Sequence, residues 1–140
     1  MNTHRLASAL LAAVGVAHLL PATAAFSRKG VERAYGVTVT DDDTELLLRH
    51  RASFFGLLGA ALLAGAADDR YRRPAIAAGS VSVGSFLLLA RASDRLSPEL
   101  HRVQRVDVAL FVALAAAAAC EVAPRQRRLP PEGDSGIRPG

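Results

Sequence analysis

The sequence predicts an all-α membrane protein, a four-helix transmembrane bundle with antiparallel, up-down topology. Four stretches contain no Asp, Glu, Lys or Arg: Leu6–Phe26, Ala52–Ala67, Pro74–Ala90 and Val108–Cys120. A helix needs about 20 mostly apolar residues to cross a bilayer, and the shorter stretches reach this length when their flanking charges lie at the interface or inside the protein. Polar links join the stretches, so each can form one span.

The chain of 140 residues is expected to form one membrane domain with a short tail. The domain covers 1–124, and its spans lie near 5–26, 45–67, 74–92 and 99–123. Residues 125–140 are rich in Pro, Gly and charge, a composition typical of a disordered C-terminal tail. A soluble, alanine-rich helical bundle is the alternative fold, because alanine is a good helix former but a weak membrane residue.

The first apolar stretch has two interpretations. Residues 1–24 have the features of a secretory signal peptide, with His4 and Arg5, an apolar run and the small residues Ala22-Thr23-Ala24. The apolar run is longer than the ~7–15 residues of a typical signal core, so we expect it to remain as the first span. Cleavage would leave three spans.

The second span follows the longest connection, residues 27–44, whose start is expected to form a short interfacial helix. Asp43 or Thr44 is the expected cap of the helix that follows. On that helix, Glu45, Arg49 and the small residues share one face at about 100° per residue. Small residues spaced by four let membrane helices approach closely. The residues expected to pack against a neighbouring helix are Gly56, Gly59 and Ala60.

The third and fourth spans begin at recognisable helix-start signals. Residues 68–73 are predicted to form a polar hinge, with Pro74 at the first position of the third helix. Ser97 is the expected cap of the fourth helix, and Pro98 its first residue. This helix should therefore begin before His101.

The basic charge points to lipid rather than to nucleic acid. The net charge is +4, but the arginines are spread over every link and the aromatic residues are too few to stack bases. Anionic lipid headgroups account for the charge, so the expected partners are membrane lipids, with a membrane-protein partner or a homo-oligomer as further possibilities.

Orientation follows from the Lys and Arg residues near the span ends. With the N-terminus inside, seven arginines lie on the inner side and five basic residues on the outer side. We therefore expect a multi-pass protein of the cell (inner or plasma) membrane with both termini in the cytoplasm. The inner set is Arg5, Arg70, Arg72, Arg73, Arg125, Arg127 and Arg128, and the outer set is Arg28, Lys29, Arg33, Arg91 and Arg95.

Antiparallel threading brings a set of polar side chains to one depth in the outer half of the bundle. An ionised group inside a bilayer is costly unless it is paired, so Asp107 needs a cation. Arg49 is the first choice and Arg105 the second, whereas Arg51 is expected to reach the headgroups. This polar cluster comprises His18, Arg49, His50, His101, Arg105 and Asp107.

Two interpretations of this cluster stay open. It is either a structural ion pair that fixes helix register, or a polar pocket for the anionic head of a lipid or a quinone-like molecule. His18 lies three residues before Pro21, which removes the hydrogen bond to the Ala17 carbonyl. A histidine at that point is a candidate proton relay or ligand contact, or a hydrogen-bonded interior residue.

The search for catalytic and cofactor motifs is negative. The sequence contains no HExxH, GxSxG, P-loop or GxGxxG motif, and no Glu-x-x-His pair of the di-iron type. No catalytic residue, metal ligand or cofactor is therefore predicted. Cys120 is the only cysteine, so an internal disulfide is excluded.

The segment Leu46-Leu47-Leu48-Arg49-His50-Arg51-Ala52, followed by Phe55-Gly56-Leu57-Leu58-Gly59, resembles a group of small four-span bacterial membrane proteins of unknown function. The resemblance covers most of residues 15–112 and implies a four-span topology and importance for Arg49 and Asp107. Some similar chains carry the name phosphopantetheine adenylyltransferase, but this sequence has neither an HxGH motif nor alternating strands and helices. Further matching motifs are His18-Leu19-Leu20-Pro21, Tyr35-Gly36-Val37, Ser85-Phe86 and Arg105-Val106-Asp107.

The function expected from these observations is that of a small, non-enzymatic integral membrane protein. It would bind a lipid, a quinone-like amphiphile or a partner subunit at the polar cluster. The alternative is a membrane-embedded enzyme that uses His18, His50 or His101 as acid and base while Arg49 holds an anion.

Overall fold

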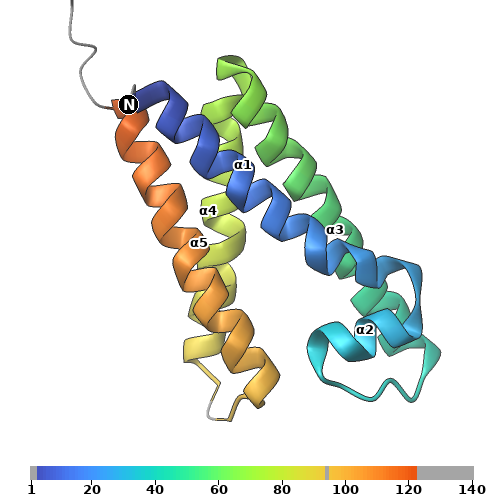
Figure 1. The fold of residues 1–140 in the computed structure, drawn as a ribbon. Helices are drawn as coiled ribbons and strands as arrows, with labels where there is room; N and C mark the ends of the chain where they lie inside the picture. Colours follow the sequence, from blue (N-terminus) through green and yellow to red (C-terminus); the bar gives the residue numbers. More distant parts are fainter. Residues whose placement is uncertain (1–2, 94, 123–140) are drawn as a thin grey trace, which may run out of the picture.

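The computed structural model describes residues 3–93 and 95–122, and this part of the chain is entirely helical, with no strand (Figure 1). The predicted all-α class is therefore confirmed. The tail at 125–140 lies outside the described residues. The elements are α1 (Thr3–Ala22), the 3-10 helix η1 (Thr23–Phe26), α2 (Arg28–Tyr35), α3 (Asp42–Ala67), α4 (Asp69–Arg91) and α5 (Pro98–Val122).

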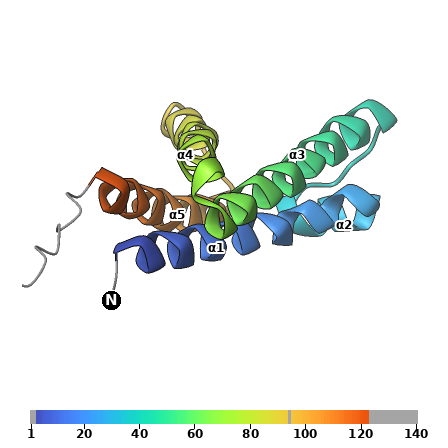
Figure 2. The same ribbon diagram turned by 90° about the horizontal axis from the view of Figure 1, so that it is seen from above.

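Four segments are long and apolar enough to cross a membrane: Thr3–Phe26, α3, α4 and α5. Each of the four long helices packs against two others, because α1 and α4 both contact α3 and α5. Figure 2 shows α1 and α4 on opposite sides of the molecule. The main core lies where the four helices meet and consists of Ala7, Leu11, Val14, Leu62, Ala75, Ile76, Val83, Leu114 and Ala117.

The short helix α2 lies over the start of α3 (Figure 1), so the short helix expected after the first span is present, and its interfacial position remains a prediction. The Ser27 hydroxyl accepts a hydrogen bond from the backbone N–H of Gly30 and caps its start. Gly36 ends it at φ 64°, a left-handed conformation that glycine adopts without a steric penalty. A second apolar cluster fixes α2 in place and consists of Ala24, Val31, Tyr35, Val39 and Ala52.

The starts of α3 and α5 follow ordinary capping chemistry. The cap of α3 is Asp41, whose carboxylate accepts from the Thr44 backbone N–H at 2.8 Å, rather than the predicted Asp43 or Thr44. The hydrogen bonds from Thr44 hold the pKa of Asp41 below its usual range. At α5, the Ser97 hydroxyl accepts from the Leu100 backbone N–H at 3.2 Å and Pro98 is the first helical residue, as predicted.

The predicted hinge at 68–73 is wrong. Helix α4 begins at Asp69, because the Asp68 carboxylate accepts from the Arg70 backbone N–H at 2.9 Å and starts the helix at once. Pro74 therefore lies inside α4, where it leaves the Arg70 carbonyl without its helical donor. The extra turn before Pro74 carries Arg72 towards the other helices, which determines the chemistry at this end of the molecule.

Candidate functional site

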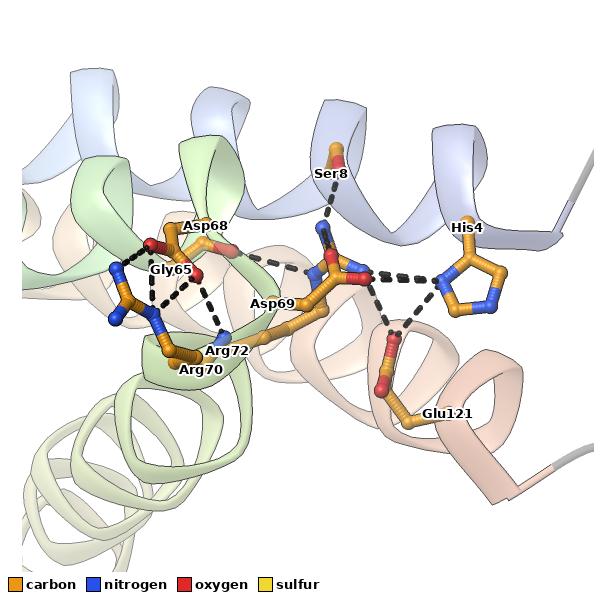
Figure 3. Close-up of polar contacts among 8 residues, drawn as sticks. All are labelled: His4, Ser8, Gly65, Asp68, Asp69, Arg70, Arg72 and Glu121. Atoms are coloured by element: carbon orange, nitrogen blue, oxygen red, sulfur yellow. Dashed lines mark hydrogen bonds and ion pairs between the residues drawn. The ribbon is translucent and has the colours of Figure 1, made fainter.

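Arg72 is one of two buried polar residues in the described part of the chain, with 3% of its surface exposed. Its guanidinium donates to Ser8 Oγ at 2.7 Å, to Glu121 Oε1 at 3.2 Å and to the Gly65 carbonyl at 3.2 Å, and it pairs with Asp69 at 2.6 Å. Figure 3 shows these partners converging from α1, α3, α4 and α5. One side chain thus joins all four long helices.

His4 completes this Arg72 cluster, which we define as His4, Ser8, Asp69, Arg72 and Glu121. Its Nδ1 lies 3.3 Å from Arg72 Nη1 and 4.0 Å from Glu121 Oε1 (Figure 3). The Glu121 side chain is only 14% exposed. Both carboxylates are paired with the arginine, so the cluster is a closed ionic contact between helices.

Sequence reasoning missed the Arg72 cluster. It placed Arg72 in a hinge and counted it among the residues that face the cytoplasm. The signal that could have found it is the Asp68 cap, because a helix starting there sets Asp69 and Arg72 one turn apart on one face. The long-range partner, Glu121, has no local signature.

A second polar group gathers towards the other end of the bundle, around two adjoining cavities of 250 and 430 Å³. Both cavities are lined by His18 of α1, Arg51 of α3 and Asp107 of α5. We use the name Arg51 cavity for the two adjoining cavities together, including the three polar side chains that line both of them. Aromatic side chains complete the walls of the smaller one: Phe54, Phe55 and Phe86.

His18 is the second buried polar residue, with 3% of its surface exposed. Its Nδ1 lies 2.9 Å from the Val14 carbonyl oxygen in the preceding turn of α1. Because a carbonyl only accepts hydrogen bonds, Nδ1 carries the hydrogen and a neutral ring keeps Nε2 as an acceptor. The Ala17 carbonyl, which Pro21 deprives of its helical donor, is not the partner of this ring.

Arg51 is held by aromatic rings. Its guanidinium carbon lies 5.5 Å from the ring centre of Phe55 and 5.7 Å from those of Tyr35 and Phe86. These distances are those of cation–π contacts, which Arg makes more often than Lys. Arg51 therefore lies among rings of α2, α3 and α4 while the residue stays exposed, and its reach to the headgroups remains a prediction.

Asp107 is half-buried and shares its cavity with Arg51 and His18. Neither Asp107 nor Arg51 makes an ion pair within residues 3–93 and 95–122. The two charges face one space without the direct contact that the Arg72 cluster has. Because both charges line this cavity without touching, a third group can enter the space and contact both of them.

The expected pair of Arg49 with Asp107 does not form. Arg49 donates to the Ala25 carbonyl at 2.8 Å and to Glu45 at 3.2 Å. Arg49 and Arg51 are separated by about 200° around α3, so only one of them can face α5. η1 covers the side of α3 that carries Arg49, and the Ala25 carbonyl accepts a hydrogen bond from the guanidinium. Glu45, one turn earlier on the face that it was expected to share with Arg49, forms an ion pair with it.

Three other members of the predicted cluster lie on the surface. His50 is exposed and packs edge-to-face against Phe54, with ring centres 4.7 Å apart. His101 and Arg105 are exposed on the first turns of α5. None of the three lines the Arg51 cavity. Of the six predicted residues, the structure thus brings only His18 and Asp107 together.

The small face of α3 lies against α1 over part of its length. A Cβ added at Gly59 would lie 2.9 Å from the Gly15 carbonyl oxygen, so these helices are in backbone contact there. A Cβ at Gly56 would lie 3.5 Å from Ala22 Cβ, an ordinary contact. Ala60 is exposed and lies outside this contact.

Within the described residues, no group of three or more His, Cys, Asp or Glu side chains could hold a metal ion. The chain matches no protein-family model, no curated protein and no solved structure.

Proposed function

We propose that the protein is a four-span integral membrane protein of the plasma membrane, with antiparallel helices, that binds a small amphiphile in the Arg51 cavity. The membrane part of this proposal is supported by four helices of spanning length. It is also supported by large apolar side chains exposed on their outer faces, such as Leu57, Val81 and Leu88, at 67%, 72% and 70%. In a bilayer these side chains contact lipid instead of water.

The antiparallel topology is supported by the residues that meet in the Arg72 cluster. His4 and Ser8 belong to the start of α1, Asp69 and Arg72 to the start of α4, and Glu121 to the end of α5. Helices that begin or end at one membrane face alternate in direction along the chain. The resemblance to small four-span membrane proteins is part of the same proposal.

Cytoplasmic termini are proposed from the arginine excess on that side of the spans. The excess is seven arginines against five basic residues, leaving aside Arg49, Arg51, Arg102 and Arg105, which lie within α3 and α5. A variant with Arg73→Cys in a Cys120→Ala background tests it, since Arg73 is exposed at the start of α4. An impermeant thiol reagent should label Arg73→Cys only after the cells are opened, and labelling of intact cells would reverse the orientation.

The observation that carries the binding proposal is the Arg51 cavity itself. Ionisable groups within a bilayer are costly, and they persist where they pair, meet water or bind a ligand. Arg51 and Asp107 both line the cavity, and they form no ion pair with each other within the described chain. A ligand's polar head between them would offset this cost.

The rest of the larger cavity suits an apolar tail. Its lining includes Leu20, Val106 and Leu110, and Leu20 and Val106 are 71% and 49% exposed. Volumes of 250 and 430 Å³ are close to or within the range of small-ligand sites, about 300–1,000 Å³. A molecule with a polar head and an apolar chain matches both parts of this space.

A bulky substitution at the rim tests the binding proposal. Val106→Trp should fill the larger cavity and expel the amphiphile that copurifies with the wild type in mild detergent. Val108→Trp is the matched control, because both valines lie on α5 with 49% and 48% exposure but only Val106 lines the cavity. The measurement is the amount of non-detergent amphiphile per protein, by native mass spectrometry.

The expected result is a loss of bound amphiphile in Val106→Trp and wild-type occupancy in Val108→Trp. Equal occupancy in the two variants, or a wild type that retains no amphiphile, would contradict the proposed function. A carbonate wash of cell membranes checks the membrane part separately, because an integral protein stays in the pellet.

A further inference from the structure

We propose that the amphiphile bound in the Arg51 cavity has a neutral head that carries an aromatic hydroxyl group, as in a phenol or a quinol. This inference rests on the proposed function, and it specifies which class of amphiphile the cavity accepts. It follows from the charge balance, the hydrogen-bonding capacity and the aromatic walls of the cavity.

The charge balance favours a neutral head. The smaller cavity, which would hold the head, is lined by one arginine, Arg51, and one carboxylate, Asp107. A second arginine, Arg102, lines only the larger cavity, and both arginines are exposed. At the smaller cavity the two charges cancel when His18 is neutral. A phosphate or carboxylate head would gain attraction from Arg51 but would be repelled by Asp107 at similar range. A neutral head meets no such repulsion.

The hydrogen-bonding groups favour a head that both donates and accepts. The Val14 carbonyl takes the Nδ1 hydrogen of His18, so Nε2 of the neutral ring accepts, as does the Asp107 carboxylate. Arg51 lies near three ring centres and donates no hydrogen bond to another described residue, so its N–H groups remain available donors. A hydroxyl group can donate to one of the acceptors while its oxygen accepts from Arg51.

The walls of the smaller cavity favour an aromatic head. Phe54, Phe55 and Phe86 line it together with the three titratable groups and with Ser82 and Ser85. Aromatic pairs in offset or edge-to-face contact contribute about 0.5–1.5 kcal/mol beyond the area that they bury. A ring that carries a hydroxyl group therefore satisfies the aromatic walls and the polar groups together, whereas an aliphatic alcohol satisfies only the polar groups.

Three probes with the same ten-carbon tail test this inference: 4-decylphenol, decylbenzene and decyl phosphate. Calorimetric titration of the protein in phosphatidylcholine nanodiscs gives their affinities. The expected result is that 4-decylphenol binds at least tenfold more tightly than either other probe. This ranking uses the wild-type protein and does not depend on the folding of any variant.

A charge-removing variant tests the physical reason. Asp107→Asn leaves the arginine charge uncompensated, so decyl phosphate should bind at least tenfold more tightly than it does to the wild type. Asp43→Asn is the control, because it removes an exposed carboxylate from the first turn of α3, away from the cavity. It should leave the three affinities unchanged.

The outcomes distinguish a wrong choice of head group from a failure of amphiphile binding as a whole. Equal or tighter binding of decyl phosphate to the wild type would overturn the neutral head and leave amphiphile binding intact. Equal binding of decylbenzene and 4-decylphenol would show that the head is not recognised. An unchanged phosphate affinity in Asp107→Asn would overturn the charge-balance argument. Failure of all three probes to bind would contradict the proposed function itself.

Discussion

The two ends of the molecule hold their arginines in opposite ways. In the Arg72 cluster, the guanidinium is 3% exposed and contacts groups from all four long helices (Figure 3). In the Arg51 cavity, the guanidinium lies over three aromatic rings and faces Asp107 without an ion pair in the described chain. One arginine joins helices, and the other lines a space between them.

This difference shows that burial and ion pairing distinguish an arginine that stabilises the fold from one that is available to bind a ligand. A paired, buried arginine holds its helices together, and removing either partner leaves a charge without compensation. An arginine beside a cavity and a separated carboxylate adds little to helix packing. Its charge is available to a molecule that enters. Substitutions at the two ends test this contrast.

Loss of the buried arginine should have the largest effect. Arg72→Leu leaves Glu121 partly buried without its cation, which typically costs about 3–5 kcal/mol of folding free energy. Arg73→Leu, at an exposed neighbouring position, is the control and should change little. Unfolding by detergent titration, followed by circular dichroism, measures both. Similar stabilities for the two variants would contradict a stabilising role for the Arg72 cluster.

Neutralising one acid at each end sharpens the comparison. Glu121→Gln keeps the shape but loses a charged hydrogen bond to Arg72, at a cost of about 1–3 kcal/mol. Asp107→Asn should leave the ligand-free protein as stable as the wild type or more stable, since an unpaired, half-buried carboxylate is costly. The same unfolding assay compares the two. A larger loss in Asp107→Asn would mean that this acid is a structural partner.

Glycines at the two ends should respond differently to an added methyl group. A Cβ at Gly65, beside the Arg72 cluster, would lie 2.7 Å from Ala75 Cβ, so Gly65→Ala should cost about 1–3 kcal/mol. A Cβ at Gly56 would meet only Ala22 Cβ at 3.5 Å, so Gly56→Ala should be neutral or stabilise the helix by up to about 1 kcal/mol. Equal losses would show that packing is uniform along α3.

The smallest effect is expected at Tyr35, beside the Arg51 cavity. Its buried hydroxyl has no hydrogen-bond partner among the described residues, so Tyr35→Phe should not lower stability. Burial raises the pKa of the Tyr35 phenol, so the wild type should lose stability as the pH rises above about 10. Tyr35→Phe should reduce that loss, and Tyr71→Phe, at an exposed position, should not. A stability loss in Tyr35→Phe at neutral pH would mean that the Tyr35 hydroxyl makes a stabilising hydrogen bond.

Local sequence signals predicted the helices well, because apolar runs and helix caps are properties of short segments. Ser97 and Pro98 marked the start of α5, and the link after the first span gave α2. The start of α4 was misplaced because Pro74 is a common first helical residue, whereas the competing Asp68 cap begins the helix earlier.

The candidate site was predicted only in part, because it depends on contacts between distant segments. His18 and Asp107 were identified as intramembrane polar residues, and both line the cavity. The choice between Arg49 and Arg51 depended on where η1 lies relative to α3. The helical periodicity of α3 places Arg49 and Arg51 on different faces, but it does not show which neighbouring element packs against each face. The Ala25 carbonyl decides it by accepting from Arg49.

Photoaffinity labelling locates the bound amphiphile and thereby tests its binding in the Arg51 cavity. The purified protein is irradiated with two probes, an alkylphenol and an alkyl phosphate, each with a diazirine in its chain, and labelled peptides are identified with and without excess unlabelled probe. The account predicts that competed labels from at least one probe concentrate around Leu20 and Pro21 of α1 and from Val103 to Leu110 of α5, which line the larger cavity. Competed labels spread over the outer faces of α3 and α4, or an absence of competition, would contradict it.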